Sequence, residues 1–190
     1  DLSDAAALGS WIESGEPNRF LDGARRAILV NNAAIVQPVG RLDQQVASAV
    51  TRAVTLNVAA PLALSAAFAA ATAGMEDRRI LHISSGASTT PIAGWSVYCA
   101  SKAALDHHAR TVARDGTPAQ RIASVAPGVI DTEMQASIRD TGEDRFPDRA
   151  YFVALKERGQ LRDPDEAGRA LVDFLLSDRF GRSPVADLRG

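Results

Sequence analysis

The sequence predicts an α/β fold, a doubly wound parallel sheet covered by helices on both faces. Three short, largely apolar runs, at residues 27–30, 79–83 and 122–125, have the length and composition of strands buried on both sides. Longer stretches with helical periodicity separate them. Strands that alternate with helices build parallel sheets, because each helix carries the chain back to the end where the next strand starts.

The composition is that of an ordinary globular protein and argues against several kinds of function. With 190 residues, 46% hydrophobic and 23% charged, we expect one domain over residues 1–190. The net charge of −2 gives no case for nucleic acid or an anionic membrane as partner, and neither a secretory signal nor a continuous apolar run of about 18 residues is visible. Cys99 is the single cysteine, so we expect a cytoplasmic protein without an intrachain disulfide. No His, Cys, Asp or Glu cluster has metal-ligand spacing, so we expect no metal.

The first part of the chain is expected to hold two helical regions around the first strand. Ser3 or Asp4 can cap a helix over residues 5–14, which a Gly-Glu-Pro-Asn stretch should end. A long Ala-rich helical region starts near residue 40 and extends to about residue 72. Pro61 should kink or divide that region, because proline removes one helical hydrogen bond.

The remaining elements follow from turn residues and apolar periodicity. Residues 87–95 form a loop punctuated by Pro and Gly, and a helix is expected over 96–115. Residues 131–162 are polar and carry charges of both signs, which fits either short helices or a mobile loop. Asp163-Pro164 should start another helix, and 184–188 form a possible last strand.

The three predicted strands end in polar or tightly turning residues: Asn31-Asn32, Ser84-Ser85 and Pro127-Gly128. In parallel α/β sheets, ligands bind beyond the carboxyl ends of the strands. These three motifs are therefore expected to meet at one crevice, which is the predicted functional site.

Tyr98 and Lys102 are the strongest candidates for chemistry. A spacing of four residues places both side chains on one face of the predicted helix, one turn apart. A neighbouring cation favours the phenolate and should lower the phenol pKa from its usual value of about 10. The alternative is a Tyr packed at the start of a helix with a solvated Lys nearby.

The motifs together resemble the short-chain dehydrogenase/reductase family, and the resemblance covers nearly the whole chain. The residues that carry it are Asn31-Asn32-Ala33-Ala34, Asn57, Ser85 at thirteen residues before Tyr98, Tyr98-x-x-x-Lys102, and Pro127-Gly128-Val129-Ile130-Asp131-Thr132. This resemblance implies a Rossmann fold and hydride transfer between a nicotinamide coenzyme and a carbonyl carbon.

The resemblance also assigns roles to single residues. It implies that Tyr98 gives its proton to the carbonyl oxygen and that Ser85 donates a hydrogen bond to the same oxygen. Lys102 would also hold the nicotinamide ribose, and the backbone of Asn57 would hold a water beneath Lys102. The implied coenzyme-binding residues are Asp1, Leu2, Asn32, Ala33, Tyr98, Lys102, Pro127, Gly128, Ile130 and Thr132.

Two features depart from the family pattern. The Asn-Asn turn has Ala34 where the family has Gly, a small change unless the backbone needs a positive φ. The Gly-rich turn and the N-terminal strands of the family are absent from the given sequence, and Asp1-Leu2 resembles the end of the family's third strand. We therefore expect that on the order of 60 residues of a Rossmann half are missing from it.

Within the family, the sepiapterin and benzil (diketone) reductases are most similar. The shared features include Gly94-Trp95, Tyr98-Cys99 and the segment from Pro127 to Gln135. The likeness implies reduction of a vicinal dicarbonyl with NADP(H) favoured over NAD(H). It also suggests Asp187 as an anchor for a pterin ring, against an ordinary surface Asp, while Trp95 lines the substrate pocket or simply caps the core.

Other functions stay open at this point. The chain could be a general 3-oxoacyl or secondary-alcohol dehydrogenase of the same family, or a non-catalytic cofactor-sensing protein with the Rossmann fold. By resemblance, the helices near 44–72 and 96–115 should form the interface of a homodimer or homotetramer. Residues 131–162 should be a mobile cover over a small-molecule carbonyl substrate.

Three further side chains are expected to be structural. His82 lies within a predicted strand and should be packed in the core. His107 and His108 lie two to three turns beyond Tyr98 and should be surface or interface residues.

Overall fold

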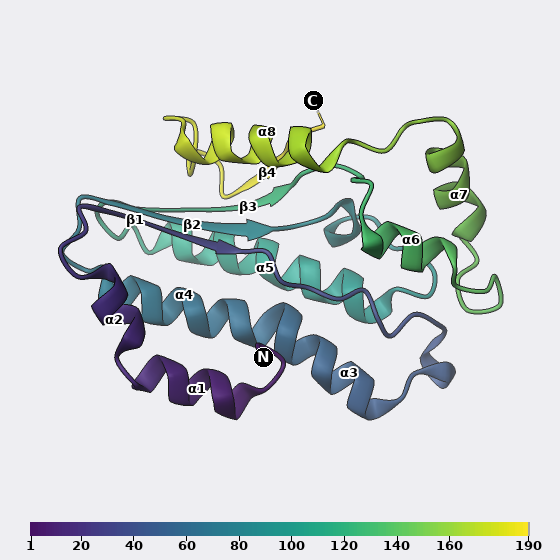
Figure 1. Cartoon of the computed structure of the whole chain (residues 1–190), viewed down its shortest axis with the longest axis horizontal. Coiled ribbons are helices and arrows are strands. Elements are labelled where there is room, and N and C mark those ends of the chain that lie inside the picture. Colours follow the sequence, from purple (N-terminus) through teal and green to yellow (C-terminus); the bar gives the residue numbers. More distant parts are fainter. Residues whose placement is uncertain (190) are drawn as a thin grey trace.

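The computed structural model describes residues 1–189 and contains a four-stranded parallel sheet (Figure 1). Its strands are β1 (Arg26–Asn31), β2 (Asp77–Ile83), β3 (Gln120–Ala126) and β4 (Val185–Asp187). They lie side by side in chain order, and each neighbouring pair is parallel. The prediction of a parallel α/β sheet is confirmed, with the first three strands extended by one or two residues at their ends.

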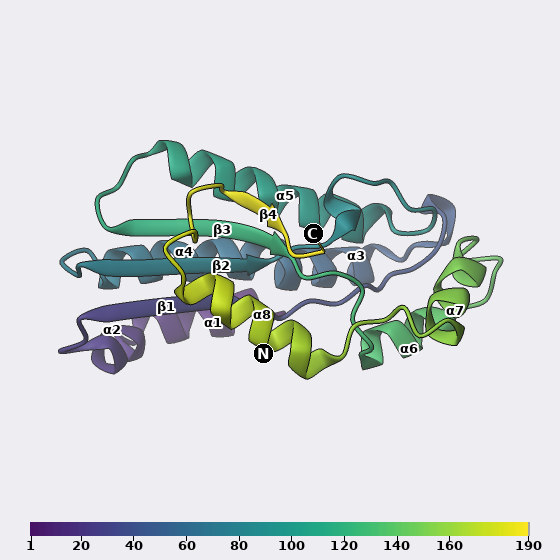
Figure 2. The same cartoon turned by 90° about the horizontal axis from the view of Figure 1, so that it is seen from above.

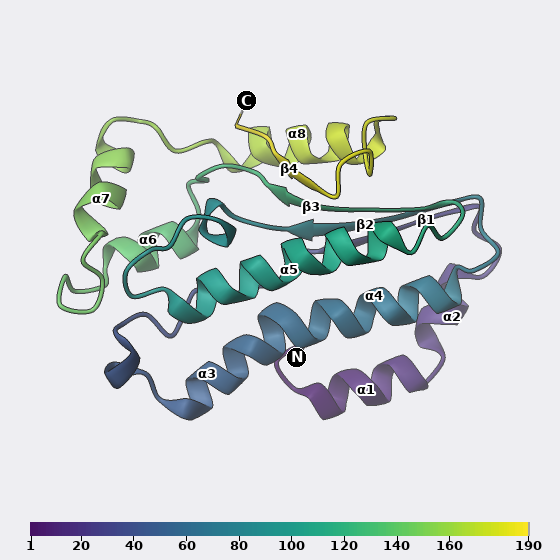
Figure 3. The same cartoon turned by 180° about the vertical axis from the view of Figure 1, so that it is seen from behind.

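The helices cover both faces of this sheet (Figures 1 and 3). They are α1 (Ala5–Glu13), α2 (Glu16–Leu21), α3 (Ala47–Val54), α4 (Ala60–Ala71), α5 (Ser96–Arg114), α6 (Glu133–Arg139), α7 (Arg149–Glu157) and α8 (Pro164–Leu176). Helices α4 and α5 lie under one face and α8 lies over the other, while α1 and α2 contact α4 on its side away from the sheet. Helices α6 and α7 lie beyond the carboxyl ends of the strands (Figure 2).

Alternating side chains of the central strands supply the two cores. Ile80 of β2 and Ile122 of β3 pack with Phe68 of α4. Their neighbours in sequence, Leu81 and Ala123, point to the opposite face and pack with a cluster that includes Leu175 of α8. This alternation is the two-residue period of a strand, with both faces buried because helices cover each side.

An ion-pair cluster joins the strands at their amino ends. The carboxylate of Asp77 is bound by Arg26 of β1 at 2.6 Å, by Arg79 of β2 at 2.9 Å and by Arg121 of β3 at 2.8 Å. Hydrogen bonds from Arg79 and Arg121 hold the pKa of this carboxyl well below its usual range. This cluster lies at the end of the sheet opposite to the predicted site.

Two helical regions differ from the prediction. The Gly-Glu-Pro-Asn stretch does not simply end the first helix, because Gly15 adopts a left-handed conformation and Pro17 sits in the first turn of α2. In the region expected from residue 40, a 3₁₀ turn at Leu42–Gln44 comes first and α-helix begins only at Ala47. One π-helical turn, Thr55–Ala59, then divides the helix just before Pro61. Such turns are frequent at functional sites.

Two loop regions contain short helices. The predicted loop over 87–95 starts with a 3₁₀ turn, Gly86–Ser88, and the polar segment 131–162 folds as α6 and α7. Of the two alternatives for that segment, short helices are therefore correct. Its mobility without ligand stays a prediction.

The helical stretch 47–71 is long and apolar enough to cross a membrane by length and composition alone. The expectation from continuous apolar runs missed this, because the polar residues in it are few and scattered. In the structure, α4 packs on β1 and β2 and carries the buried side chain of Phe68. A core helix can be as long and as apolar as a helix that crosses a membrane. The packing of α4 is that of a core helix.

Candidate active site

A cavity of about 1200 Å³ lies at the carboxyl ends of the strands, where the three turn motifs were predicted to meet. Ten of the predicted site residues line it: Asn32, Ala33, Ser85, Trp95, Tyr98, Lys102, Pro127, Gly128, Ile130 and Thr132. The residues come from four separate parts of the chain, and the order of the strands brings them together. Of the other predicted residues, Asp1, Leu2, Asn57 and Asp187 are not part of this lining.

Tyr98 lies in the first turn of α5 with its side chain almost completely buried, and its phenol lines the cavity. Burial raises the pKa of the phenol, while a hydrogen bond with the Ser85 side chain opposes that rise. The expectation that Lys102 lowers this pKa is therefore wrong for this structure, because desolvation of the phenolate dominates. A phenol with a raised pKa stays protonated near neutral pH and can donate its proton.

Lys102 follows one turn later on α5 and is only 3% exposed. Its ammonium donates a hydrogen bond to the carbonyl of Ile83 at 2.8 Å and lies 5.5 Å from the centroid of the Tyr98 ring. Burial lowers the lysine pKa to about 8, and the nearby Asp106 opposes that shift. The ammonium is thus still mainly protonated at neutral pH, with N–H groups left over for a ligand.

Ser85 is the second residue after the carboxyl end of β2. Its extended backbone precedes the 3₁₀ turn Gly86–Ser88, and its hydroxyl accepts a hydrogen bond from the backbone N–H of Ala87 at 3.2 Å. This cap fixes the side chain, whose oxygen can still donate a proton toward the cavity or the phenol of Tyr98.

Asn57 lies in the π-helical turn and is buried. Its amide accepts a hydrogen bond from the backbone N–H of Ile35 at 2.9 Å and donates one to the carbonyl of Ile35 at 2.8 Å. The side chain therefore ties the turn after β1 to the helix below it. Because the side-chain amide is engaged by Ile35, only the backbone of Asn57 is available for the predicted part in proton transfer.

Asp106 is a buried carboxylate beside Lys102 that the sequence argument missed. It is 2% exposed and accepts hydrogen bonds from the hydroxyls of Ser84 at 2.7 Å and Ser124 at 2.6 Å. Because it lies one helical turn after Lys102, it also supplies a negative charge behind the ammonium. The available signal was the period of four residues shared by Tyr98, Lys102 and Asp106.

The turn after β3 lines the cavity and lets the Arg162 side chain lie against the backbone of Gly128. Gly128 has φ of +99°, a conformation that favours glycine, and a Cβ there would lie 3.1 Å from Cδ of Arg162. Thr132 caps α6 through its hydroxyl. Together with the amide of Asn32 and the ammonium of Lys102, the cavity offers donors and acceptors for ribose and carboxamide groups. This donor set fits a nicotinamide coenzyme.

The predicted residues outside the cavity have partners elsewhere. The carboxylate of Asp1 accepts hydrogen bonds from the backbone and the hydroxyl of Ser3, both at 2.8 Å, and Leu2 follows it just before α1. Asp187, at the end of β4, is held by Arg189, whose hydrogen bonds lower the carboxyl pKa. Arg189 itself lines the cavity, although it was not among the predicted site residues.

Trp95 both lines the cavity and packs in the core. Its ring stacks on Phe146 at 5.1 Å between centroids and contacts Tyr98 edge-on at 5.3 Å. Phe152 of α7 completes this cluster, which partly buried Cys99 also joins. The cluster holds the segment that contains α6 and α7 against the start of α5. Trp95 therefore lines the cavity and is also part of the core, so each of its two interpretations is partly correct.

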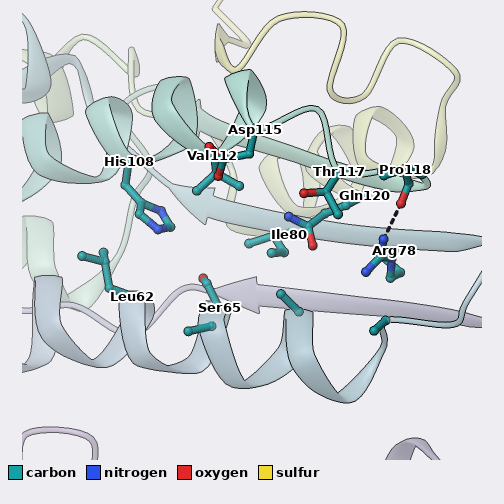
Figure 4. Close-up of a pocket in the computed structure, with 13 residues that line it drawn as sticks. Leu62, Ser65, Arg78, Ile80, His108, Val112, Asp115, Thr117, Pro118 and Gln120 are labelled. Atoms are coloured by element: carbon teal, nitrogen blue, oxygen red, sulfur yellow. Dashed lines mark hydrogen bonds between the residues drawn. The ribbon is translucent and has the colours of Figure 1, made fainter.

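A second cavity, of about 500 Å³, lies between α4 and α5 near the amino ends of β2 and β3 (Figure 4). We call it the α4–α5 groove. Leu62 and His108 flank one end of it, and Arg78 lies at the other, where its guanidinium binds the carbonyl of Pro118. Of the two histidines expected at the surface or at an interface, His107 is exposed and His108 is half-buried in this groove, and an interface position for His108 stays a prediction.

A chain of hydrogen bonds runs from this groove into the sheet. His108 and His82 share a hydrogen bond of 3.1 Å, and the other ring nitrogen of His82 lies 3.1 Å from the amide nitrogen of Asn31. His82 is completely buried, as predicted, and burial lowers its pKa to about 3. Across residues 1–189, no three His, Cys, Asp or Glu side chains are grouped so that they could hold a metal ion.

Comparison with known proteins agrees with this geometry. The family model described as short chain dehydrogenase matches residues 24–143. The chain is 34% identical to benzil reductase ((S)-benzoin forming) of Bacillus cereus, over 97% of this chain and 76% of the relative. It is 33% identical to sepiapterin reductase of Bos taurus, over 84% of this chain and 60% of the relative.

Solved structures give the same result. A short-chain dehydrogenase/reductase from Burkholderia vietnamiensis is 47% identical and superposes with a TM-score of 0.66 over all of this chain and 73% of its own. A short-chain dehydrogenase from Sphingobium yanoikuyae in complex with NADPH is 27% identical, with a TM-score of 0.73 over all of this chain and 66% of its own. The chain therefore belongs to the short-chain dehydrogenase/reductase family and is an oxidoreductase that acts on carbonyl or alcohol groups.

Proposed function

We propose that this protein uses NADPH to reduce one ketone of a vicinal dicarbonyl compound to the alcohol. The observation that carries the proposal is the arrangement of Ser85, Tyr98 and Lys102 on one wall of the large cavity. Two hydroxyls face the same space, and the ammonium lies one helical turn behind them. A protein that only senses a coenzyme needs no such proton donor.

In the proposed reaction, the bound coenzyme supplies a hydride to the carbonyl carbon. The carbonyl π bond breaks as the new C–H bond forms, and Tyr98 gives its proton to the oxygen, which yields a secondary alcohol. Ser85 donates a hydrogen bond to this oxygen while negative charge develops on it. The raised pKa of Tyr98 favours this direction, because the phenol holds its proton until the oxygen becomes basic.

Lys102 and the turns after the strands would hold the coenzyme, and Lys102 would also return the proton to Tyr98. The ammonium of Lys102 can bind ribose hydroxyls, while Asn32, Gly128 and Thr132 line the space beside them. After each turnover the phenolate must regain a proton, and Lys102 is the nearest acid on the same helix face. The backbone of Asn57 would hold the water that links Lys102 to solvent.

The preference for NADPH and for dicarbonyls is supported by the relatives. NADPH is bound in the Sphingobium yanoikuyae structure, and the curated relatives include benzil and sepiapterin reductases. Of these two substrate types, the site favours a diketone over a pterin. The carboxylate that would anchor a pterin ring, Asp187, already has both of its oxygens bound by Arg189.

The test is oxidation of NADPH with a panel of 1,2-diketones, 3-oxoacyl esters and simple ketones, followed spectrophotometrically. We expect the intact protein to prefer the diketones and Tyr98→Phe to lose turnover by a factor of about 10²–10⁴, because general acid catalysis contributes that much. Binding of NADPH should be nearly unchanged, since only the hydroxyl is removed. More than a few per cent of the original rate in Tyr98→Phe would refute the assigned proton donor, and a preference for 3-oxoacyl esters would refute the substrate class.

A further inference from the structure

Arg189 and Asp187 form a rigid unit at the end of β4, beside the reacting groups. The Nε atom of Arg189 donates to both carboxylate oxygens of Asp187, at 3.0 and 2.9 Å, and Nη2 donates to Oδ2 at 2.5 Å. The backbone N–H of Arg189 also donates to Oδ1 at 2.9 Å. Four contacts between two residues of one short turn fix the plane of the guanidinium, although both side chains are half exposed.

The guanidinium lies next to the residue that follows Ser85. A Cβ on Gly86 would lie 3.6 Å from both Nη1 and Nη2 of Arg189, and a Cβ on Gly128 would lie 3.3 Å from its Cγ. The Arg189 side chain thus passes over two glycines, one from the turn after β2 and one from the turn after β3. Its charged end lies beside Gly86, the neighbour of Ser85, and lines the same cavity as Ser85 and Tyr98.

One edge of the guanidinium has donors to spare. A guanidinium has five N–H groups in a planar fork, and Asp187 takes those on the Nε side. Of residues 1–189, none accepts a hydrogen bond from Nη1. The edge formed by Nη1 and Nη2 is therefore open to a ligand while the other edge stays bound to Asp187.

We propose that this open edge of Arg189 binds the second carbonyl oxygen of the substrate while Ser85 and Tyr98 bind the first. The inference rests on the proposed reduction of a carbonyl and names the feature that the site selects: a second oxygen acceptor on the neighbouring carbon. The two oxygens of a vicinal dicarbonyl are close together, as are the Ser85 and Arg189 ends of this wall. Arg189 is a specificity-determining residue in this assignment.

The charges around Arg189 favour a neutral oxygen over a carboxylate. Asp187 neutralises the guanidinium as a pair, and the acidic residues Glu133 and Asp148 also line the cavity. The positive charge of Lys156 is already engaged by Asp131 at 2.5 Å. Because the guanidinium is already paired with Asp187, the carboxylate of a 2-oxo acid would gain less from Arg189 than from an unpaired cation, whereas the neutral oxygen of a diketone would gain a charge-assisted hydrogen bond.

The test compares 1-phenylpropane-1,2-dione with 1-phenylpropan-1-one, which lacks only the second carbonyl. Arg189→Met keeps most of the length of the side chain and removes its donors, and Arg189→Lys restores one charged donor. We expect Arg189→Met to lower kcat/KM for the dione about 10- to 100-fold, the range for a hydrogen bond to a charged group, and to change the monoketone less than about 2-fold. Arg189→Lys should recover part of the loss, and Arg169→Met, on the exposed surface of α8, should change neither substrate.

Equal losses on both substrates, or none on either, would overturn the role of Arg189 while leaving the carbonyl reductase intact. A wild-type protein that prefers phenylglyoxylate to the dione, and loses that preference in Arg189→Met, would overturn the neutral oxygen as its ligand. Binding of the dione to Tyr98→Phe, followed by quenching of tryptophan fluorescence, tests Arg189 without turnover. In that background Arg189→Met should weaken dione binding about 10-fold or more, and unchanged binding would overturn the proposal even if the protein reduces no carbonyl.

Discussion

Two cavities at opposite ends of β2 each contain a buried cation, and only one of them has the features of an active site. Lys102 binds the carbonyl of Ile83 at the carboxyl end of the strand, whereas Arg78 lies at the amino end and lines the α4–α5 groove. Both side chains are 3% exposed. Burial of a positive charge is therefore not what distinguishes the two places.

The difference lies in what surrounds each cation. Lys102 has the carboxylate of Asp106 behind it and the hydroxyls of Tyr98 and Ser85 beside the same cavity. Arg78 binds the carbonyl of Pro118, and its Nε has no partner within residues 1–189. The groove in front of it combines small side chains of α4 with polar ones such as Asp115, Thr117 and Gln120, and among the residues that the structure describes its lining contains neither a tyrosine nor a lysine. A cation acts in chemistry where proton donors and acceptors converge on it, and the strand ends supply that convergence.

The largest expected effect separates the two cations directly. We predict that Lys102→Met lowers kcat/KM by a factor of about 10²–10⁴ and also weakens NADPH binding, because Lys102 serves both the proton path and the ribose. Arg78→Met should change kcat/KM less than about 3-fold and leave stability equal or higher, since it replaces a poorly paired buried cation by an apolar side chain. Steady-state kinetics and urea unfolding of both variants test the comparison, and a similar loss of activity in both would refute it.

The residues on which this comparison depends were predictable to different degrees. The strands could be located within two residues because β1, β2 and β3 are short apolar runs with clear ends. The cavity lining followed from the polar residues after those ends, since parallel strands place their carboxyl ends together. Tyr98 and Lys102 were visible as a pair because they share one helix, where spacing in sequence fixes spacing in space.

Features that depend on contacts between distant residues were not predictable in this way. The π-helical turn around Asn57 is tied to Ile35, which lies 22 residues earlier. His108 turns inward because His82, 26 residues earlier on β2, accepts or donates its hydrogen bond. Arg189 reaches the cavity only because β4 pairs with β3 and brings it beside Gly128. No local pattern encodes these three pairings.

A second prediction concerns the histidine pair that lies between the two cavities. Burial, together with the nearby charges of His108 and Lys102, lowers the pKa of His82 to about 3, against the opposing charge of Asp106. In the unfolded protein His82 has its usual pKa of 6.5, whereas in the folded protein the ring stays neutral down to a much lower pH. Folding stability is therefore full above pH 6.5 and falls as the pH decreases toward 3. The half-buried His108, whose pKa is also lowered, adds to the same trend.

The measurement is the free energy of unfolding by urea at several pH values between 6.5 and 4.5. We expect His82 alone to account for a loss of up to about 1.4 kcal/mol per pH unit. His82→Asn removes the titrating ring and keeps an amide that can bond Asn31 or His108, so its stability should depend less on pH by about that amount. His107→Asn changes an exposed histidine on α5, next to His108, and should leave the dependence of stability on pH as in the wild type. Identical slopes for wild type and His82→Asn would exclude the buried pair as the acid-sensitive element.

The smallest expected effect on catalysis concerns the α4–α5 groove itself. We predict that the protein is a dimer or tetramer and that α4 and α5 form part of the interface, since their exposed small residues allow close helix packing. Ala66 is exposed and lines the groove. A charged side chain at this position would have to be buried without a partner in an assembled interface, which is strongly unfavourable.

We therefore expect Ala66→Glu to shift the protein to smaller species in light scattering, while kcat/KM changes less than about 3-fold, because the reacting groups lie at the other end of the strand. Ala136→Glu makes the same change on the exposed surface of α6 and should leave the assembly state unchanged. A wild-type monomer at micromolar concentration, or the same assembly in wild type and Ala66→Glu, would show that this face is not an interface. A large loss of activity in Ala66→Glu with unchanged assembly would instead contradict the separation of the two cavities, because it would show that the groove acts on the chemistry at Lys102.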